Sequence, residues 1–320
     1  MRAALDIAAV VIGRNEGARL IACLDALQGQ VARVVYVDSG STDGSQEAAR
    51  ARNADVVTLD LARPFTAARA RNAGLDHLRM GGPPRYVQFL DGDCRLQPGW
   101  IETAREFLDA HPEVAVACGR RREEFPASSV YNRLIDAEWD TPVGRARSCG
   151  GDALMRTEAL DAVGGYNPAL IAGEEPELCV RLRAEGWQIW RLDAEMALHD
   201  AAMTRFGQWW QRTRRGGYAF AEGVALHGAP PERHCVAPLR RIVAWGLVLP
   251  LATVLGALVS PWALLLLLAW PAQVVRLRLR GRPWYQAVFL TLSKLPEAQG
   301  ALTYWWRRLT RARARLIEYK

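Results

Sequence analysis

Short apolar runs alternate with helical patterns along the first part of this 320-residue chain. Strands that alternate with helices of about 10–15 residues are typical of βαβ units. We therefore expect an α/β fold that is Rossmann-like, with a mostly parallel sheet flanked by helices. The expected order is strand 7–12, helix 16–27, strand 31–37, helix 45–52, strand 54–59, helix 66–78 and strand 86–90.

Polar clusters follow three of these expected strands, at residues 13–17, 38–45 and 91–93. In open α/β sheets, ligands bind outside the carboxyl ends of the strands. We expect the three clusters to meet at one edge of the sheet and to line a binding crevice. Residues 111–200 have a less regular pattern, with strands expected at 114–118 and 187–192. The second of these reads as an edge strand, and both should extend the same sheet.

Residues 242–275 contain no charged residue. As one straight helix they would extend roughly 50 Å, well beyond a hydrocarbon core of about 30 Å. Prolines interrupt the segment, and Ser260-Pro261 is the expected break. Arginines flank both ends, so the positive-inside rule places both ends in the cytoplasm. Two short passes or a re-entrant hairpin satisfy this pattern, whereas a single span does not.

The alternative for this segment is a pair of buried helices in a soluble protein. This alternative is disfavoured because the segment lacks a polar face that could contact solvent. The amphipathic segment 284–309 follows, and it fits either an anionic membrane surface or packing on the rest of the chain. We place the domain boundary between residues 235 and 236. The chain is thus expected to have an α/β domain at 1–235 and a membrane-associated helical tail at 236–320.

Charge divides the chain in a similar way. Residues 201–320 contain 18 Lys and Arg against 4 Glu, whereas residues 1–200 contain 23 basic and 30 acidic residues. A uniformly basic nucleic-acid-binding domain has a different distribution, so we expect no nucleic-acid partner. The 6 cysteines are scattered without metal-ribbon or secreted-domain spacing, which indicates a reducing compartment. No signal-peptide pattern precedes the first strand, so the body is expected to stay in the cytoplasm.

Several acidic side chains have the spacing of a catalytic site. Asp91 and Asp93 follow a strand, and two such carboxylates can bind one Mg²⁺ or Mn²⁺ ion that also contacts phosphate. A solvated turn is the alternative. Adjacent Glu174 and Glu175 would raise the pKa of one member and prepare a general base, or they form an acidic cluster at a helix start. His199 is either a metal ligand or a structural residue.

Two basic positions are candidates for a nucleotide pocket. Arg71 lies on the expected helix 66–78, where it could hold a phosphate or belong to a solvated helical face. Arg14 and Glu16 follow the first strand, in a turn that either faces a nucleotide or is an ordinary βα loop.

The order of motifs resembles that of the family 2 glycosyltransferases of the GT-A fold, over about residues 7–200. The matching motifs are Val11-Ile12-Gly13-Arg14-Asn15-Glu16, Val37-Asp38-Ser39-Gly40-Ser41-Thr42-Asp43-Gly44-Ser45, Ala70-Arg71-Asn72-Ala73-Gly74, Asp91-Gly92-Asp93, Gly164-Gly165-Tyr166, Gly173-Glu174-Glu175-Pro176-Glu177-Leu178, Arg181-Leu182-Arg183 and Gly186-Trp187.

The resemblance implies roles for particular residues. Asp38 would contact the nucleobase, and Arg14, Glu16 and Arg71 would line the nucleotide pocket. Asp91 would face the ribose and the metal. Asp93 would be the main metal ligand, with His199 as a further ligand. Glu175 stands where the family has a catalytic Asp, and Gly150, Gly151 and Glu174 would border the acceptor. Where the family often has two Asp, this chain has Asp38-Ser39.

The resemblance also implies an activity. The expected enzyme transfers a sugar from a nucleotide-diphosphate-sugar, a UDP-sugar in preference to a GDP-sugar, with inversion and with Mn²⁺ or Mg²⁺ as cofactor. From the hydrophobic tail we expect a glycan or lipid-linked acceptor at the cytoplasmic face of the inner membrane. The alternatives are a processive polysaccharide synthase and a non-catalytic membrane-tethered scaffold. Residues 211–215 lack the Trp of the processive enzymes' Gln-x-x-Arg-Trp motif, and the intact acidic residues disfavour a scaffold.

Overall fold

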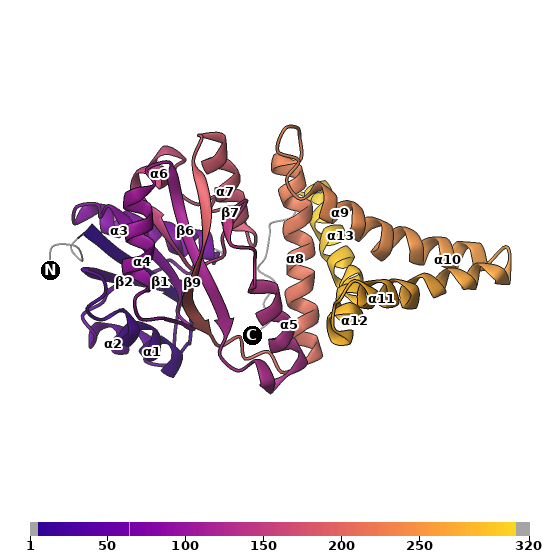
Figure 1. Cartoon of the computed structure of the whole chain (residues 1–320), viewed down its shortest axis with the longest axis horizontal. Helices are drawn as coiled ribbons and strands as arrows, with labels where there is room; N and C mark the ends of the chain where they lie inside the picture. Colours follow the sequence, from indigo (N-terminus) through magenta and orange to yellow (C-terminus); the bar gives the residue numbers. More distant parts are fainter. Residues whose placement is uncertain (1–5, 64, 312–320) are drawn as a thin grey trace. The chain divides into compact units, whose positions relative to one another are not determined.

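The computed structural model describes residues 6–63 and 65–311 (Figure 1). Its contacts divide the chain into two compact units, Met1–Ala202 and Met203–Lys320. The expected domain boundary lies further along, after residue 235. The difference arises from helix α8 (Phe206–His227), which packs against the last helix of the C-terminal unit and so belongs with that unit. The two units are described separately below.

Within the described residues, the first unit contains a 9-stranded sheet in the order β3-β2-β1-β4-β8-β6-β9-β5, with β7 paired to β9. The strands are β1 (Ile7–Gly13), β2 (Arg33–Asp38), β3 (Asp55–Thr58), β4 (Tyr86–Asp91), β5 (Cys94–Leu96), β6 (Val114–Glu123), β7 (Gly144–Ala146), β8 (Ala153–Arg156) and β9 (Gln188–His199). The helices of this unit are α1 (Ala18–Leu27), α2 (Ser45–Arg50), α3 (Ala67–Met80), α4 (Trp100–Ala110), η2 (Pro126–Ser128), α5 (Val130–Trp139), α6 (Thr157–Ala162) and α7 (Glu174–Ala184).

The expected βαβ units account for half of the sheet. Strands β1 to β4 are parallel to one another, as the alternation of strands and helices predicts. Beyond β4 the sheet is mixed, because β8 runs antiparallel to both β4 and β6, and β5 and β7 run antiparallel to β9. The α/β class is therefore confirmed, and the prediction of a mostly parallel sheet holds only for its first half.

Burial explains why these segments form the centre of the sheet. Every residue of β1 from Ile7 to Ile12 is buried, which is typical of a strand covered by helices on both faces. Helix α3 packs close to this strand at Gly74, where an added Cβ would lie 2.4 Å from the Cγ1 of Val10. Only glycine permits that approach. This contact holds α3 against β1 and β2.

Strand β9 corrects the expectation of an edge strand at 187–192. It continues to His199 and has neighbours on both sides, because it pairs with β6 along its length and with β5 near its end. The apolar alternation of Ala194, Met196 and Leu198 continues past the polar Asp193, where the pattern was expected to stop. This extension places His199 directly opposite Cys94 and Glu123 in the two ladders.

All regular elements in the described part of the C-terminal unit are helices. Helix α8 packs against α13 with very little space between the backbones. An added Cβ on Gly217 would lie 2.0 Å from the carbonyl oxygen of Glu297, and one on Gly300 would lie 1.9 Å from that of Arg214. The elements that follow α8 are α9 (Val236–Val243), η3 (Ala244–Val248), α10 (Leu249–Ala257), η4 (Pro261–Leu268), α11 (Ala269–Leu279), α12 (Trp284–Leu292) and α13 (Lys294–Thr310).

Two continuous helical segments of this unit are long and apolar enough to cross a membrane, Val236–Ala257 and Pro261–Leu279. They form the hairpin drawn at the α10 and α11 labels in Figure 1. The expected break is confirmed, since Ser260 is extended and Pro261 begins the second segment. The amphipathic segment 284–309 is two helices, and α13 packs on α8. Its association with a membrane surface stays a prediction.

Candidate active site

A buried guanidinium joins three carboxylates from distant parts of the sequence. Arg71 on α3 is 2% exposed, and its Nη2 lies 2.8 Å from Oδ1 of Asp91 at the end of β4. Its Nη1 lies 3.1 Å from Oε1 of Glu174 and 2.7 Å from Oε1 of Glu175, at the start of α7. The residue expected as general base is therefore in the same cluster as the residue expected to face the ribose and metal.

Burial and charge act in opposite directions within this cluster. Burial raises the pKa of Glu175, the adjacent Glu174 raises it further, and Arg71 lowers it, with a net value of about 7. Burial alone would lower the pKa of Arg71, but Glu175 and Asp91 outweigh that effect, so this pKa is raised and the guanidinium remains charged. A carboxylate with a pKa near the working pH is well suited to general-base catalysis.

The expected metal ligands lie together at the ends of β4, β5 and β9. Nε2 of His199 is 3.3 Å from Oδ1 of Asp93, and both side chains are buried. Cys94 completes one group of potential ligand atoms with Asp93 and His199 and a second group with Asp91 and Asp152. Burial raises the pKa of the Cys94 thiol well above its usual range, so it stays protonated and is a poor ligand for a hard cation.

Orphaned polar atoms support a cation site here. Within the described residues, buried Nδ1 of His199 has no hydrogen-bond partner, and Oδ2 of Asp152 has only an ion pair with Arg121 at 3.3 Å. Oε2 of Glu123 lies 3.9 Å from that Nδ1. Buried polar atoms normally have partners, so an ion, a water or a ligand is expected nearby. Carboxylates and one imidazole are a donor set that suits Mg²⁺ or Mn²⁺.

Sequence reasoning missed two residues that border this cluster. Asp152, just before β8, accepts a hydrogen bond from the amide of Asp91 at 3.1 Å. Arg121 on β6 lies 3.3 Å from Oδ2 of Asp152 and 3.6 Å from Oδ2 of Asp91. Its guanidinium also stacks 4.3 Å from the ring centroid of Trp139. The sequence signal that could have identified Asp152 is its position between a glycine pair and an apolar run. Arg121 lies in a run of arginines, and no neighbouring residue distinguishes it.

The expected acceptor residues lie against the same carboxylates. An added Cβ on Gly151 would lie 2.6 Å from Nη2 of Arg71 and 3.0 Å from Oδ2 of Asp91. Gly150 is exposed, and its nearest neighbour on that side is Arg121. Glu174 contacts Arg71 and is otherwise buried. Their contact with an acceptor stays a prediction.

The loops expected to hold the nucleotide are tied to each other. The Asn15 amide donates to Ser41, and the Thr42 amide donates to the Asn15 side chain. Arg14 in the first loop is exposed, and Glu16 pairs with Arg19 at 2.6 Å. This connection brings the loops after β1 and β2 to the same edge of the sheet.

Asp38 has a structural role in the second loop. Its Oδ1 accepts from the hydroxyl of Tyr36, and its Oδ2 accepts from the amides of Gly40 and Ser41 and from the side chain of Gln46. Burial raises its pKa, but these hydrogen bonds outweigh burial and hold the pKa below its usual value. Its contact with a nucleobase stays a prediction.

Comparison with known proteins found a matching family model and related sequences. Residues 9–160 match the model of glycosyl transferase family 2. The succinoglycan biosynthesis protein ExoA of Rhizobium meliloti is 28% identical over 267 residues, which cover 78% of this chain and 80% of that protein. The pre-mycofactocin glycosyltransferase of Mycobacterium tuberculosis is 26% identical over 272 residues, 80% of this chain and 55% of that protein.

Solved structures share the fold. The mannosyltransferase PcManGT from Pyrobaculum calidifontis, in complex with GDP-Man and Mn²⁺, superposes with a TM-score of 0.67 at 20% identity over 95% of this chain and 88% of that one. Glucosyl-3-phosphoglycerate synthase from Mycobacterium tuberculosis, in complex with Mn²⁺ and UDP, gives a TM-score of 0.51 at 20% identity over 72% and 82%. The matching family model and the relatives above identify residues 9–160 as a glycosyltransferase domain of family 2, and the solved structures share its GT-A fold.

Proposed function

We propose that the chain transfers a sugar from a nucleoside-diphosphate-sugar to a hydroxyl group of a glycan or lipid-linked acceptor, with inversion of the anomeric carbon and with Glu175 as general base. The observation that supports this most directly is the shared Arg71, which contacts Asp91 on one side and Glu175 on the other. A base and a donor-binding carboxylate that share one buried cation must face the same small volume. Inversion requires the acceptor oxygen and the leaving group to lie on opposite faces of the sugar.

Asp91, Asp93 and His199 would hold the divalent cation of this enzyme. Mn²⁺ or Mg²⁺ accompanies the nucleotide in the solved structures of similar fold, and the donor set of this chain fits such an ion. When bound, a divalent cation neutralises the negative charge on the departing nucleoside diphosphate.

The protein's own residues complete the proposed chemistry. Glu175 removes the proton of the acceptor hydroxyl while that oxygen forms a bond to the anomeric carbon and the bond to the diphosphate breaks. Arg71 orients Glu175 and adds positive charge beside Asp91. General-base assistance of this kind contributes roughly 10²–10⁴-fold to the rate. Glu175 is one methylene longer than the Asp that the family has at this position.

A UDP-sugar is the donor that we propose, in preference to a GDP-sugar. Among the structural neighbours, the mannosyltransferase holds GDP-Man and the glucosyl-3-phosphoglycerate synthase holds UDP. Isothermal titration of the intact chain with UDP-glucose and with GDP-mannose, each with Mn²⁺, separates the two. Tighter binding of the guanine nucleotide would overturn the preference.

The proposed location is the cytoplasmic face of the inner membrane. Two apolar helices and the flanking arginines support association with a membrane. The relative in succinoglycan biosynthesis supports a glycan or lipid-linked acceptor. We propose a single transfer, and several sugars added per acceptor would instead indicate the processive synthase.

The variant Glu175→Gln tests the central assignment. It keeps the size and the hydrogen-bonding oxygen of the side chain but cannot accept the proton. We expect donor affinity within about threefold of wild type and a loss of turnover of roughly 10²–10⁴-fold. Glu185→Gln, at the exposed end of the same helix, is the matched control and should transfer normally. Turnover close to wild type in Glu175→Gln would exclude this base, and wild-type protein that neither transfers nor hydrolyses any nucleotide sugar would favour the scaffold.

A further inference from the structure

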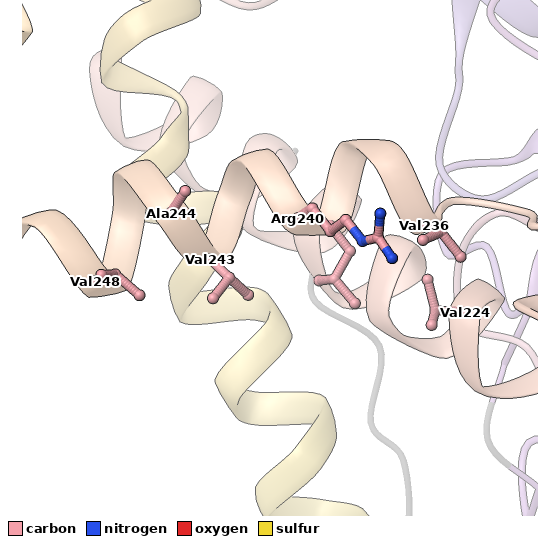
Figure 2. Close-up of a pocket in the computed structure, with 7 residues that line it drawn as sticks. Val224, Val236, Arg240, Val243, Ala244 and Val248 are labelled. Atoms are coloured by element: carbon pink, nitrogen blue, oxygen red, sulfur yellow. The ribbon is translucent and has the colours of Figure 1, made fainter.

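An apolar groove opens in the C-terminal unit where α9 and η3 pack beside α8. Its volume is about 410 Å³, and Figure 2 shows the residues that line it. Aliphatic side chains from the three elements form its walls, and one lining residue is charged, Arg240. The aliphatic residues are Val224, Val236, Leu239, Val243, Ala244 and Val248.

Arg240 is exposed and has no ion pair among the described residues of this unit. Within the described residues, the side chains of Arg240 and Arg241 make no hydrogen bond or ion pair. Acidic residues are scarce in this part of the chain, with 4 Glu against 18 basic residues from residue 201 onward. One of them, Glu297, already pairs with Lys294. The Arg240 guanidinium lines an apolar groove and has no carboxylate partner among the described residues, so it is suited to bind the anionic group of a ligand.

The groove also has the dimensions of a lipid site. From Arg240 to Val248 the helix advances roughly 12 Å, close to the half-thickness of about 15 Å of a hydrocarbon core. Figure 2 shows the Arg240 guanidinium on the side of Val236 and Val224, with Val248 at the opposite end. Arg240 stands near the start of the candidate span Val236–Ala257. An arginine at this depth reaches the phosphate level of a bilayer while its stem stays in apolar surroundings.

We propose that this groove binds the lipid part of the acceptor, with a phosphate on Arg240 and one hydrocarbon chain along Val243 and Val248. This inference rests on the lipid-linked acceptor of the proposed function and gives it a site. A peptide bound in the groove would leave the Arg240 guanidinium unpaired unless the peptide placed a carboxylate next to it. A neutral lipid would fill the groove but leave the charge unused.

The test uses the full chain in nanodiscs of phosphatidylcholine, without any nucleotide sugar. The probe is a photoreactive long-chain prenyl monophosphate, and the crosslinked residues are mapped by peptide mass spectrometry. We expect labels on α9 and η3 and competition by the unlabelled prenyl phosphate. The prenyl alcohol of the same chain length and phosphatidylglycerol should compete at least fivefold less well. Equal competition by phosphatidylglycerol would show a site for bulk anionic lipid and overturn the proposal, as would equal competition by the alcohol.

Variants separate the two parts of the site. Arg240→Gln should lower crosslinking about tenfold, as expected for the loss of one charge-assisted contact, and Arg240→Lys should recover part of it. Val243→Trp should block the groove. Arg278→Gln, which removes an arginine beside the other apolar segment and outside the groove, should have no effect. Unchanged crosslinking in Arg240→Gln or in Val243→Trp would refute the site. Because no donor is present, this result is independent of the Glu175→Gln experiment.

Discussion

The pKa of Glu175 lies near 7 because opposing effects of burial and neighbouring charges balance, and a change at a single residue can shift it. Burial and Glu174 raise its pKa to about 7, against the lowering effect of Arg71. A general base must be deprotonated, so kcat should rise about tenfold between pH 6 and pH 8 and then level off. Glu174→Gln removes the neighbouring like charge, so the pKa falls and the midpoint moves to lower pH. Single-turnover rates across pH measure both midpoints, and a midpoint that stays or rises in Glu174→Gln would contradict this account.

Asp152 binds the backbone amide of Asp91, the residue expected to face the metal. Its Oδ1 accepts the Asp91 amide, and its Oδ2 lies 3.3 Å from Arg121. In Asp152→Asn the hydrogen-bond acceptor remains but the charge is lost, so Arg121 is free to pair more closely with Asp91 and to compete with a cation. We expect Mn²⁺ affinity to fall about tenfold, equivalent to 1.4 kcal/mol. Electron paramagnetic resonance of free Mn²⁺ measures this directly. Asp193→Asn, on an exposed part of β9, is the control, and equal affinity in both variants would remove Asp152 from this role.

The site residues that could be predicted are those with a local signature. Asp91, Asp93 and Glu175 stand next to a strand end or a helix start, where a carboxylate has a recognisable reason to be. Arg121 has no such context, because its importance arises only when β6 pairs with β9 and turns it toward Asp91 and Asp152. Pairing between strands distant in sequence is tertiary information that periodicity does not contain.

At the scale of elements, the close contact between α8 and α13 depends on glycines at the points where the two helices meet. A Cβ added at Gly217 would lie 2.0 Å from the carbonyl oxygen of Glu297. A Cβ added at Gly216, its neighbour on α8, would have nothing within 4 Å. Gly217→Ala should therefore destabilise the unit by about 1–3 kcal/mol through overpacking. Gly216→Ala should be neutral or stabilise the unit by about 0.5–1 kcal/mol, because the unfolded chain has less conformational freedom at alanine than at glycine. Thermal unfolding in detergent compares the two, and equal melting temperatures would argue against the close contact.

Element boundaries show where periodicity succeeds and where packing overrides it. The segments 7–12 and 86–90 are predicted within one residue at their ends, because strands buried on both faces are continuous apolar runs. Strand β9 was predicted too short, since Asp193 and Glu195 alternate outward on a strand whose other face is buried. The first half of the sheet followed from alternation, but the antiparallel β8 did not, because strand direction is set by the crossover and not by composition.

At the scale of the whole molecule, the chain joins a unit with excess acidic residues to a unit with excess arginine. The acidic unit contains the carboxylates around Arg71, which we propose as the donor site. The basic unit contains the apolar hairpin, where arginines at both ends favour one side of a membrane. The charge division and the uncharged stretch 242–275 are visible in the sequence, whereas the packing of α8 with the C-terminal unit required the structure.

The hairpin itself makes a prediction about topology. Its two segments, Val236–Ala257 and Pro261–Leu279, are each roughly 30 Å long, enough to cross a hydrocarbon core of about 30 Å. Arg241 precedes most of the first segment and Arg280 follows the second, so the arginine-rich ends lie on one side and the connection between the segments lies on the other. Two full passes would therefore expose Val259, which is 89% exposed at the tip, to the periplasm.

Cysteine labelling in intact bacterial cells distinguishes two passes from a re-entrant hairpin. In a Cys235→Ser background, where the other native cysteines are buried, Val259→Cys should react with a membrane-impermeant maleimide. Leu279→Cys, equally accessible in the protein but at the arginine-rich end, should react only after the cells are opened. Labelling of neither position in intact cells would favour the re-entrant hairpin, because its tip stays within the bilayer. Labelling of Leu279→Cys alone in intact cells would place the arginines outside and contradict the cytoplasmic location of the catalytic unit.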